Sequence, residues 1–319
     1  MPWWQWTIEI AVSLVLVVVA VFLLLLAFLW IDWLTTKRES TTTFSLFPQV
    51  PEKPAGAPRR LLVYFPDALA DGTTSIQPIM ETLRQQGDLL TVSYGTQHFN
   101  AQRIQQDVIV HLNAMRGYDE FAFVGSSLGG LMALDVHEYI RQNADDIHET
   151  PTIYLIDSPS PGVDDLFIPR ALGWLLRIVR FGVVANMLAA PIMRRNIIVP
   201  RDENIELQVN RTLVKKHAYE AQLPFTLSAL RDQVTYIIGH KPLKAAQFAG
   251  LESMVYFHCH RNNETVRQPQ AMLSWFIATA RLKNIEVMVD SPHCDFEARP
   301  LTWNRAMTEG FERSLQRSS

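Results

Sequence analysis

A serine near the middle of the chain stands in a context typical of a catalytic nucleophile. Gly125-Ser126-Ser127-Leu128-Gly129 follows a short apolar run and precedes a segment with helical apolar spacing. A G-x-S-x-G pattern between a strand and a helix places its serine on a sharp turn, and glycine is needed two residues to either side. We expect Ser127 to be a nucleophile and the N–H of Leu128 to face a developing oxyanion. The alternative is an ordinary Gly/Ser-rich turn.

A serine hydroxyl is a weak nucleophile at neutral pH unless a base accepts its proton. Of the nine histidines, His293 is the candidate because it follows the last predicted strand, as the chain order serine, acid, histidine requires. An acid must then orient the imidazole. We prefer Asp157, at the end of the strand after the serine helix. Glu264 is the substitute acid, because Asn263 fills the acid position after the penultimate strand.

The elements that must position these residues alternate along the chain. Short apolar runs predict strands at 61–65, 89–95, 121–125, 152–157, 254–259 and 285–290, and amphipathic spacing predicts helices at 75–86, 100–115, 128–143 and 268–282. This alternation is typical of an α/β fold with a mostly parallel sheet flanked by helices. Residues 160–230 depart from it and predict a helical lid insertion over the sheet edge. Residues 234–239 could be a further strand or part of that insertion.

Three segments resemble the type I thioesterase domains that release acyl chains from fatty-acid, polyketide and nonribosomal-peptide synthases, in the α/β-hydrolase superfamily. They are LLVYFPDALADGTTSIQPIMETL (61–83), GYDEFAFVGSSLGGLMALDVHEYI (117–140) and TIYLIDSPSPG (152–162). The resemblance implies an α/β-hydrolase fold, cleavage of an acyl ester or thioester, no cofactor, and Asp157 as the acid. The family's FP-x-A-type segment, here 65–68, implies the N–H of Ala68 as an oxyanion donor beside that of Leu128.

The N-terminal segment predicts a membrane anchor. Residues 10–31 contain no ionisable group, and 22 residues in a helix span roughly 33 Å, enough for a hydrocarbon core of about 30 Å. Tryptophans flank both ends, as is typical of membrane interfaces. The alternatives are a core helix and a signal peptide, but a signal peptide has a basic start and a shorter apolar core. The nearest basic residues all follow the segment, which predicts a single-pass protein with a cytoplasmic main domain.

This pattern divides the chain into an anchor at 1–34, a Pro/Thr/Ser-rich tether at 35–58 and a hydrolase domain at 59–319 with the lid insertion at about 160–230. Residues 166–195 are apolar enough for a second span, but Arg177 and Arg180 at their centre favour an amphipathic lid or a plain packing insertion. A net charge of −3 without a basic run predicts no nucleic-acid partner.

The cysteines, Cys259 and Cys294, can form at most one disulfide. His258-Cys259-His260 with residues 293–295 could hold a metal, because His258 and His260 face the same side of a strand, but a packed thiol is the preferred interpretation and no metal site is predicted. We therefore predict a membrane-anchored serine hydrolase acting on an acyl, lipid-like ester or thioester. The alternatives are acyl transfer or peptidase chemistry at the same site, and a non-catalytic membrane interaction module, which Asn263 favours.

Overall fold

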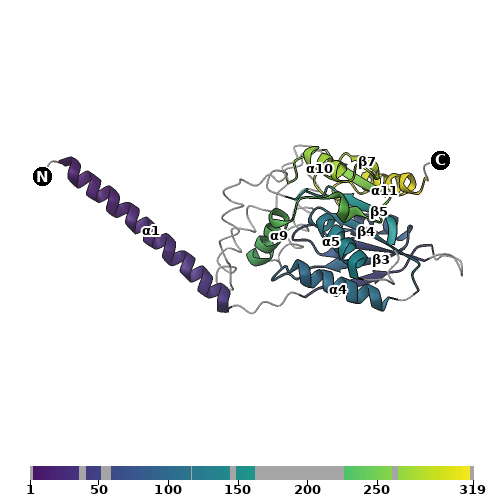
Figure 1. Cartoon of the computed structure of the whole chain (residues 1–319), viewed down its shortest axis with the longest axis horizontal. Helices are drawn as coiled ribbons and strands as arrows, with labels where there is room; N and C mark the ends of the chain where they lie inside the picture. The colour runs from purple at the N-terminus through teal and green to yellow at the C-terminus, as the bar shows by residue number, and fades with distance from the viewer. Residues whose placement is uncertain are drawn as a thin grey trace.

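The computed structural model describes residues 3–35, 41–51, 59–115, 117–143, 149–161, 226–260 and 265–316. Most of the predicted lid, residues 162–225, lies outside this range. Within the described ranges, seven strands form one sheet at the centre of the α/β part of the chain (Figure 1), in the order β1-β3-β2-β4-β5-β6-β7. The strands are β1 (Thr43–Phe47), β2 (Arg60–Phe65), β3 (Asp88–Ser93), β4 (Glu120–Ser126), β5 (Glu149–Ile156), β6 (Ser253–Cys259) and β7 (Lys283–Val289).

The sheet is parallel except at one edge, where β1 pairs antiparallel with β3. Each of the six predicted strands is confirmed within a few residues at its ends. The central ones are unbroken apolar runs because both faces of the sheet are covered. For example, Leu61, Leu62 and Val63 of β2 are completely buried.

One strand was not predicted. β1 lies inside the segment expected to be a tether, and it pairs from Thr43 with Ser93 to Phe47 with Leu89. Phe44 and Phe47 pack against the core on the two faces of the sheet, which holds this short segment at the edge.

Helices cover both faces of the sheet. One face packs against α4 (Ala101–Ala114), α5 (Leu128–Asn143), α9 (Leu227–Gly239) and α10 (Gln270–Ala278), and the other packs mainly against α3 (Met80–Arg84) and α11 (Pro300–Leu315). The short elements α2 (Gly72–Ser75), η1 (Gln77–Ile79) and η3 (Ala245–Phe248) complete the described set. The predicted helix at 75–86 is divided into α2, η1 and α3, with Pro78 within η1.

Residues 234–239, which the sequence predicted to be either a further strand or part of the insertion, belong to helix α9. The buried residues Val234, Ile237 and Ile238 follow the i, i+3, i+4 spacing of one helix face, so tertiary packing decides against the local preference of β-branched residues for strands.

The N-terminal helix α1 (Trp3–Thr35) stands apart from the sheet and its helices (Figure 1). Its apolar part, Ile8–Asp32, has 25 residues and a mean hydropathy of 3.4, and its large apolar side chains from Ile10 to Leu25 are exposed, whereas Asp32 at its end is buried. At 1.5 Å per residue this is roughly 37 Å, so α1 is long and apolar enough to cross a membrane.

Candidate active site

Ser127 lies on the tight connection from β4 to α5, with its backbone in the left-handed region at φ +50°. Its N–H donates to the carbonyl of Ile156 at 2.7 Å, and its carbonyl accepts from the N–H of Gly130 at 2.9 Å. These bonds hold a conformation that a side-chain-bearing residue adopts only when its surroundings determine it. The geometry is that of a strained strand-to-helix turn.

The flanking glycines are required by close packing of the backbone. A Cβ at Gly125 would lie 2.5 Å from the carbonyl oxygen of Gly129, and a Cβ at Gly129 would lie 2.1 Å from the carbonyl oxygen of Phe65. No relaxed side chain fits at such distances. The G-x-S-x-G pattern therefore follows from the space between α5 and the ends of β2 and β4.

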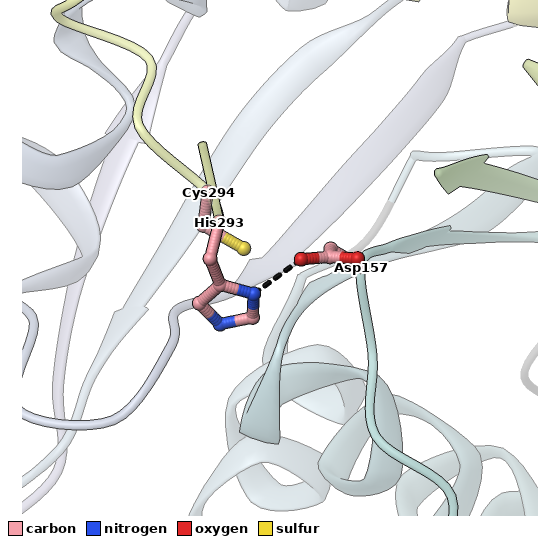
Figure 2. A group of neighbouring side chains, drawn as sticks. All are labelled: Asp157, His293 and Cys294. Carbon is pink, nitrogen blue, oxygen red and sulfur yellow. Dashed lines mark hydrogen bonds and ion pairs between the residues drawn. The ribbon is translucent and has the colours of Figure 1, made fainter. Parts of the chain in front are cut away.

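His293 lies between Ser127 and Asp157. Its Nε2 is 3.0 Å from the Ser127 hydroxyl oxygen, and its Nδ1 is hydrogen-bonded to the Asp157 carboxylate (Figure 2). A carboxylate only accepts, so Nδ1 carries the proton and Nε2 is left to accept from the serine hydroxyl. The three residues follow β4, β5 and β7, whose carboxyl ends share one edge of the sheet.

The surroundings of His293 favour its charged form. Burial opposes the charge, but the negative charge of Asp157, the hydrogen bond to it and the charge of Asp67 act the other way, and together they raise the pKa of His293 above its ordinary value. An imidazolium formed when the serine proton is taken up is thus stabilised where it arises.

Asp157 is fully buried, with φ +47°, and its N–H donates to the carbonyl of Phe257 at 2.9 Å. The Nε2 of Gln268 donates to its second carboxylate oxygen at 2.7 Å and also to the Tyr256 hydroxyl at 2.8 Å. Gln268 was missed by the sequence reasoning, because nothing in the residues around Gln268 indicates that it reaches an aspartate 111 positions away. It holds the carboxylate that orients the imidazole.

The loop between β2 and α2, residues 66–71, is called the oxyanion loop below. It carries Ala68 in a turn, and its first residue, Pro66, lies against the start of α5, since a Cβ built on Gly129 would be 2.6 Å from the Pro66 carbonyl oxygen. Leu128 is at the first helical position, where an N–H has no acceptor within its own helix. Within the described ranges neither the Ala68 nor the Leu128 N–H has a hydrogen-bond acceptor. The two predicted donors are therefore available to a ligand.

Asp67 of the same loop is a second acidic group near the histidine. Burial raises the pKa of its carboxyl to about 6, and the charge of His293 and a hydrogen bond from its own backbone N–H limit that rise. Asp67 occupies the variable position of the FP-x-A pattern, so the pattern does not indicate a role for it. Its negative charge raises the pKa of His293 from the loop, whereas Asp157 is hydrogen-bonded to the imidazole at Nδ1.

Glu264, the substitute acid, and Asn263 lie outside the described residues.

One group of side chains at the site has the spacing of possible metal ligands. In the described part of the chain, Asp157, His293 and Cys294 have potential ligand atoms within 4.8 Å of one another (Figure 2). Burial raises the pKa of Cys294 well above its ordinary value, its thiol donates to the Ile156 carbonyl, and the Nδ1 of His293 is hydrogen-bonded to Asp157, so all three groups already take part in hydrogen bonds. The cluster suits a hydrogen-bonded acid and base better than a cation.

The histidines considered as metal ligands pair with carboxylates instead. The Nδ1 of His258 lies 2.9 Å from Glu286, and the Nε2 of His260 lies 3.7 Å from Asp290. Cys259 between them is buried, and burial raises the pKa of its thiol well above the ordinary value. Both cysteines are free thiols.

Solved structures of other proteins share the fold of this chain. An enol-lactonase from Burkholderia xenovorans LB400 matches with a TM-score of 0.59 and 12% identity, over 86% of this chain and 97% of that one. A thermophilic esterase from Thermogutta terrifontis matches with a TM-score of 0.57 and 15% identity, over 88% and 97%. The RedJ thioesterase of prodiginine biosynthesis in Streptomyces coelicolor matches with a TM-score of 0.53 and 16% identity, over 83% and 92%.

No protein-family model matches the sequence, and no curated protein does. At identities of 12–16% the structural matches show the fold. The chain has the α/β-hydrolase fold, as the sequence resemblance implied.

Proposed function

We propose that this protein is a membrane-anchored serine hydrolase that cleaves an acyl ester or thioester through an acyl-enzyme. The observation that carries the proposal is the hydrogen-bonded series from the Ser127 hydroxyl through His293 to Asp157, on a strained turn at the carboxyl edge of the sheet. In this arrangement a buried acid fixes the imidazole tautomer and a neutral Nε2 faces a hydroxyl, which is what activation of a serine requires.

In the first half-reaction, the Ser127 oxygen attacks the acyl carbonyl carbon while its proton passes to His293 Nε2. The oxyanion that forms accepts hydrogen bonds from the Ala68 and Leu128 N–H groups, each of which can contribute about 2.7–4 kcal/mol to the transition state. The bond to the leaving group then breaks, and His293 donates its proton to the departing thiol or alcohol. In the second half-reaction, water gives a proton to His293 and attacks the acyl-enzyme, which releases a carboxylic acid and returns the proton to Ser127.

The substrate class rests on two supports. The fold is shared with an enol-lactonase, an esterase and a thioesterase, all named for ester-type bonds. The sequence of the oxyanion loop resembles the FP-x-A-type segment of type I thioesterase domains. A lipid-like acyl chain is proposed because the anchor would hold the site close to a membrane. No cofactor and no metal take part in the proposed reaction.

The proposed anchor is helix α1, with the hydrolase domain on the cytoplasmic side, because Lys37, Arg38 and the next basic residues follow the span. We expect the full chain to resist extraction from membrane vesicles by alkaline carbonate and to dissolve in detergent. Protease added outside sealed inside-out vesicles should digest the domain. Release by carbonate would contradict the anchor, and protection from protease would contradict the orientation.

The catalytic proposal is tested with the full chain in detergent micelles and a panel of p-nitrophenyl esters and acyl thioesters of increasing chain length. We expect wild-type turnover, and a loss of at least about 10³-fold in Ser127→Ala. Ser126→Ala is the matched control, because it removes the adjacent buried hydroxyl and should retain most of the activity. A folded wild-type protein that turns over no member of the panel would favour the non-catalytic alternative.

A further inference from the structure

The oxyanion loop is held at its middle by a residue from a distant helix. The backbone N–H of Leu69, directly after the proposed donor Ala68, donates to the side-chain oxygen Oε1 of Gln233 at 2.9 Å. Gln233 lies on α9, 164 positions later in the chain, and it is completely buried. A fully buried side-chain amide that reaches an oxyanion loop calls for an explanation, because burying polar groups is unfavourable unless they are hydrogen-bonded.

Leu69 has a strained backbone conformation that its surroundings must hold. Its φ is +57°, in the left-handed region that residues with a Cβ rarely occupy. Among the described residues, the only non-glycine residues with positive φ are Leu69, Ser127, Asp157 and Cys294, and all of them lie at the candidate site. Strained backbone of this kind persists only where its surroundings hold it, and it concentrates at functional sites.

Within the described residues, the hydrogen bonds that other elements make with the backbone of the loop and its junction to α2 otherwise lie at its two ends. The Tyr94 hydroxyl donates to the carbonyl of Pro66 at 3.3 Å, and the Gly72 N–H donates to the Ser93 hydroxyl at 3.0 Å. Both partners come from the end of β3, so they fix where the loop leaves the sheet and where it enters α2. The middle of the loop is instead held by α9, through Gln233 and through the packing of Leu69 on Ala229.

The NH₂ group of the Gln233 side chain supports a specific role for its oxygen Oε1. Its Nε2 is buried and has no hydrogen-bond partner in the described part of the chain. The Leu69 N–H needs an acceptor, so the amide oxygen must face it and the NH₂ group must point elsewhere. A buried amide with only one half hydrogen-bonded stabilises the fold less than an apolar side chain of the same shape. Its presence here is explained if the hydrogen bond to Leu69 serves the site.

We propose that Gln233 is a positioning residue of this hydrolase, which fixes the oxyanion loop through Leu69 so that the Ala68 N–H points at the reacting carbonyl oxygen. The proposal rests on the proposed function and adds a residue from α9 to the site. Gln233 acts through the loop backbone and does not itself touch the reacting atoms. It therefore affects the rate at which bound substrate reacts, with little effect on substrate binding.

The test measures acylation of Ser127 by a p-nitrophenyl ester in single turnovers, with the full chain in detergent micelles. Gln233→Met keeps the size of the side chain and removes the acceptor. We expect its maximal acylation rate to fall about 10- to 100-fold, because a misplaced oxyanion donor should cost less than the roughly 10²- to 10³-fold of a deleted donor. The half-saturating ester concentration should change less than about threefold. Gln233→Glu keeps an oxygen in reach of the Leu69 N–H and should restore the rate to within about fivefold of wild type.

Thr235→Val, two positions further along the same helix, is the control for a general disturbance of α9 and should react like wild type. If Gln233→Met does not fold, Gln233→Asn, whose amide is too short by one methylene to reach Leu69, takes its place with the same expectation. Wild-type rates in Gln233→Met or Gln233→Asn would overturn the proposal, as would equal losses in the Glu and Met variants. Absence of acylation in the wild type would instead refute the proposed function itself, so the two failures are distinct.

Discussion

Replacing Gly129 by alanine would put a methyl group against the backbone at the end of β2. The added Cβ would lie 2.1 Å from the carbonyl oxygen of Phe65 and 2.6 Å from that of Pro66, whereas real Cβ atoms essentially never approach closer than 3.0 Å. Both contacts are with backbone atoms, so no side chain can rotate away. Helix α5 and the start of the oxyanion loop must therefore separate by roughly 1 Å in a packed interior.

Overpacking of this kind costs about 1–3 kcal/mol, and we expect the upper end because both neighbours are backbone. In a domain of this size each kcal/mol lowers Tm by about 2–4 °C, so Gly129→Ala should melt roughly 6–12 °C below wild type. The shift would also separate Leu128 from the oxyanion loop, and kcat/KM on a p-nitrophenyl ester should fall at least about 100-fold.

Gly239→Ala is the matched control, since it adds the same methyl group at an exposed helical position with nothing within 4 Å. It should leave activity unchanged and alter stability by less than about 1 kcal/mol, in the stabilising direction. Thermal unfolding followed by circular dichroism and initial rates on one ester measure both variants. A Gly129→Ala protein that melts within about 2 °C of wild type and keeps more than half of the activity would refute the steric argument.

Three further outcomes are expected. His293 must be neutral to act as the base, and its pKa is raised, so kcat/KM should rise with pH through a midpoint above 6.5. Asp67→Asn removes a charge that raises the pKa of His293, so it should move this midpoint to lower pH. A shift of the midpoint to higher pH would contradict the role of Asp67. Gln268→Met removes the hydrogen bond to the carboxylate of Asp157 and should lower kcat/KM roughly tenfold, whereas an unchanged rate would show that the contact is not needed. Asp157→Asn should lower kcat by about 10³–10⁴-fold and Glu264→Gln by little; the reverse order would make Glu264 the acid.

The sheet was accessible from sequence because its central strands are apolar runs separated by polar or glycine-containing turns. β1 was missed since it is a short edge strand in a Pro/Thr/Ser-rich region, where only the pairing with β3 selects the extended strand. α9 was ambiguous because β-branched residues favour strands locally. The helix is decided by the packing of one face against the core, which requires the positions of α4 and α5.

The candidate site divides in the same way. Ser127, His293 and Asp157 could be proposed from their places after strands, because parallel strands bring their carboxyl ends to one edge, and the structure does bring these three side chains together. Gln268 and Gln233 could not be proposed. Each is a glutamine whose contact depends on how a helix or loop more than 100 positions away is packed, and no local spacing encodes that contact.

The central claim is that one hydroxyl, on Ser127, is activated by His293. The most direct measurement is labelling of the full chain with a fluorophosphonate probe, followed by peptide mass spectrometry to locate the adduct. The account predicts one phosphonate per chain, on Ser127, that is absent in Ser127→Ala, and labelling at least about 100-fold slower in His293→Ala than in wild type. Labelling of folded wild-type protein at another residue, or labelling of Ser127 at an equal rate without the imidazole, would contradict it.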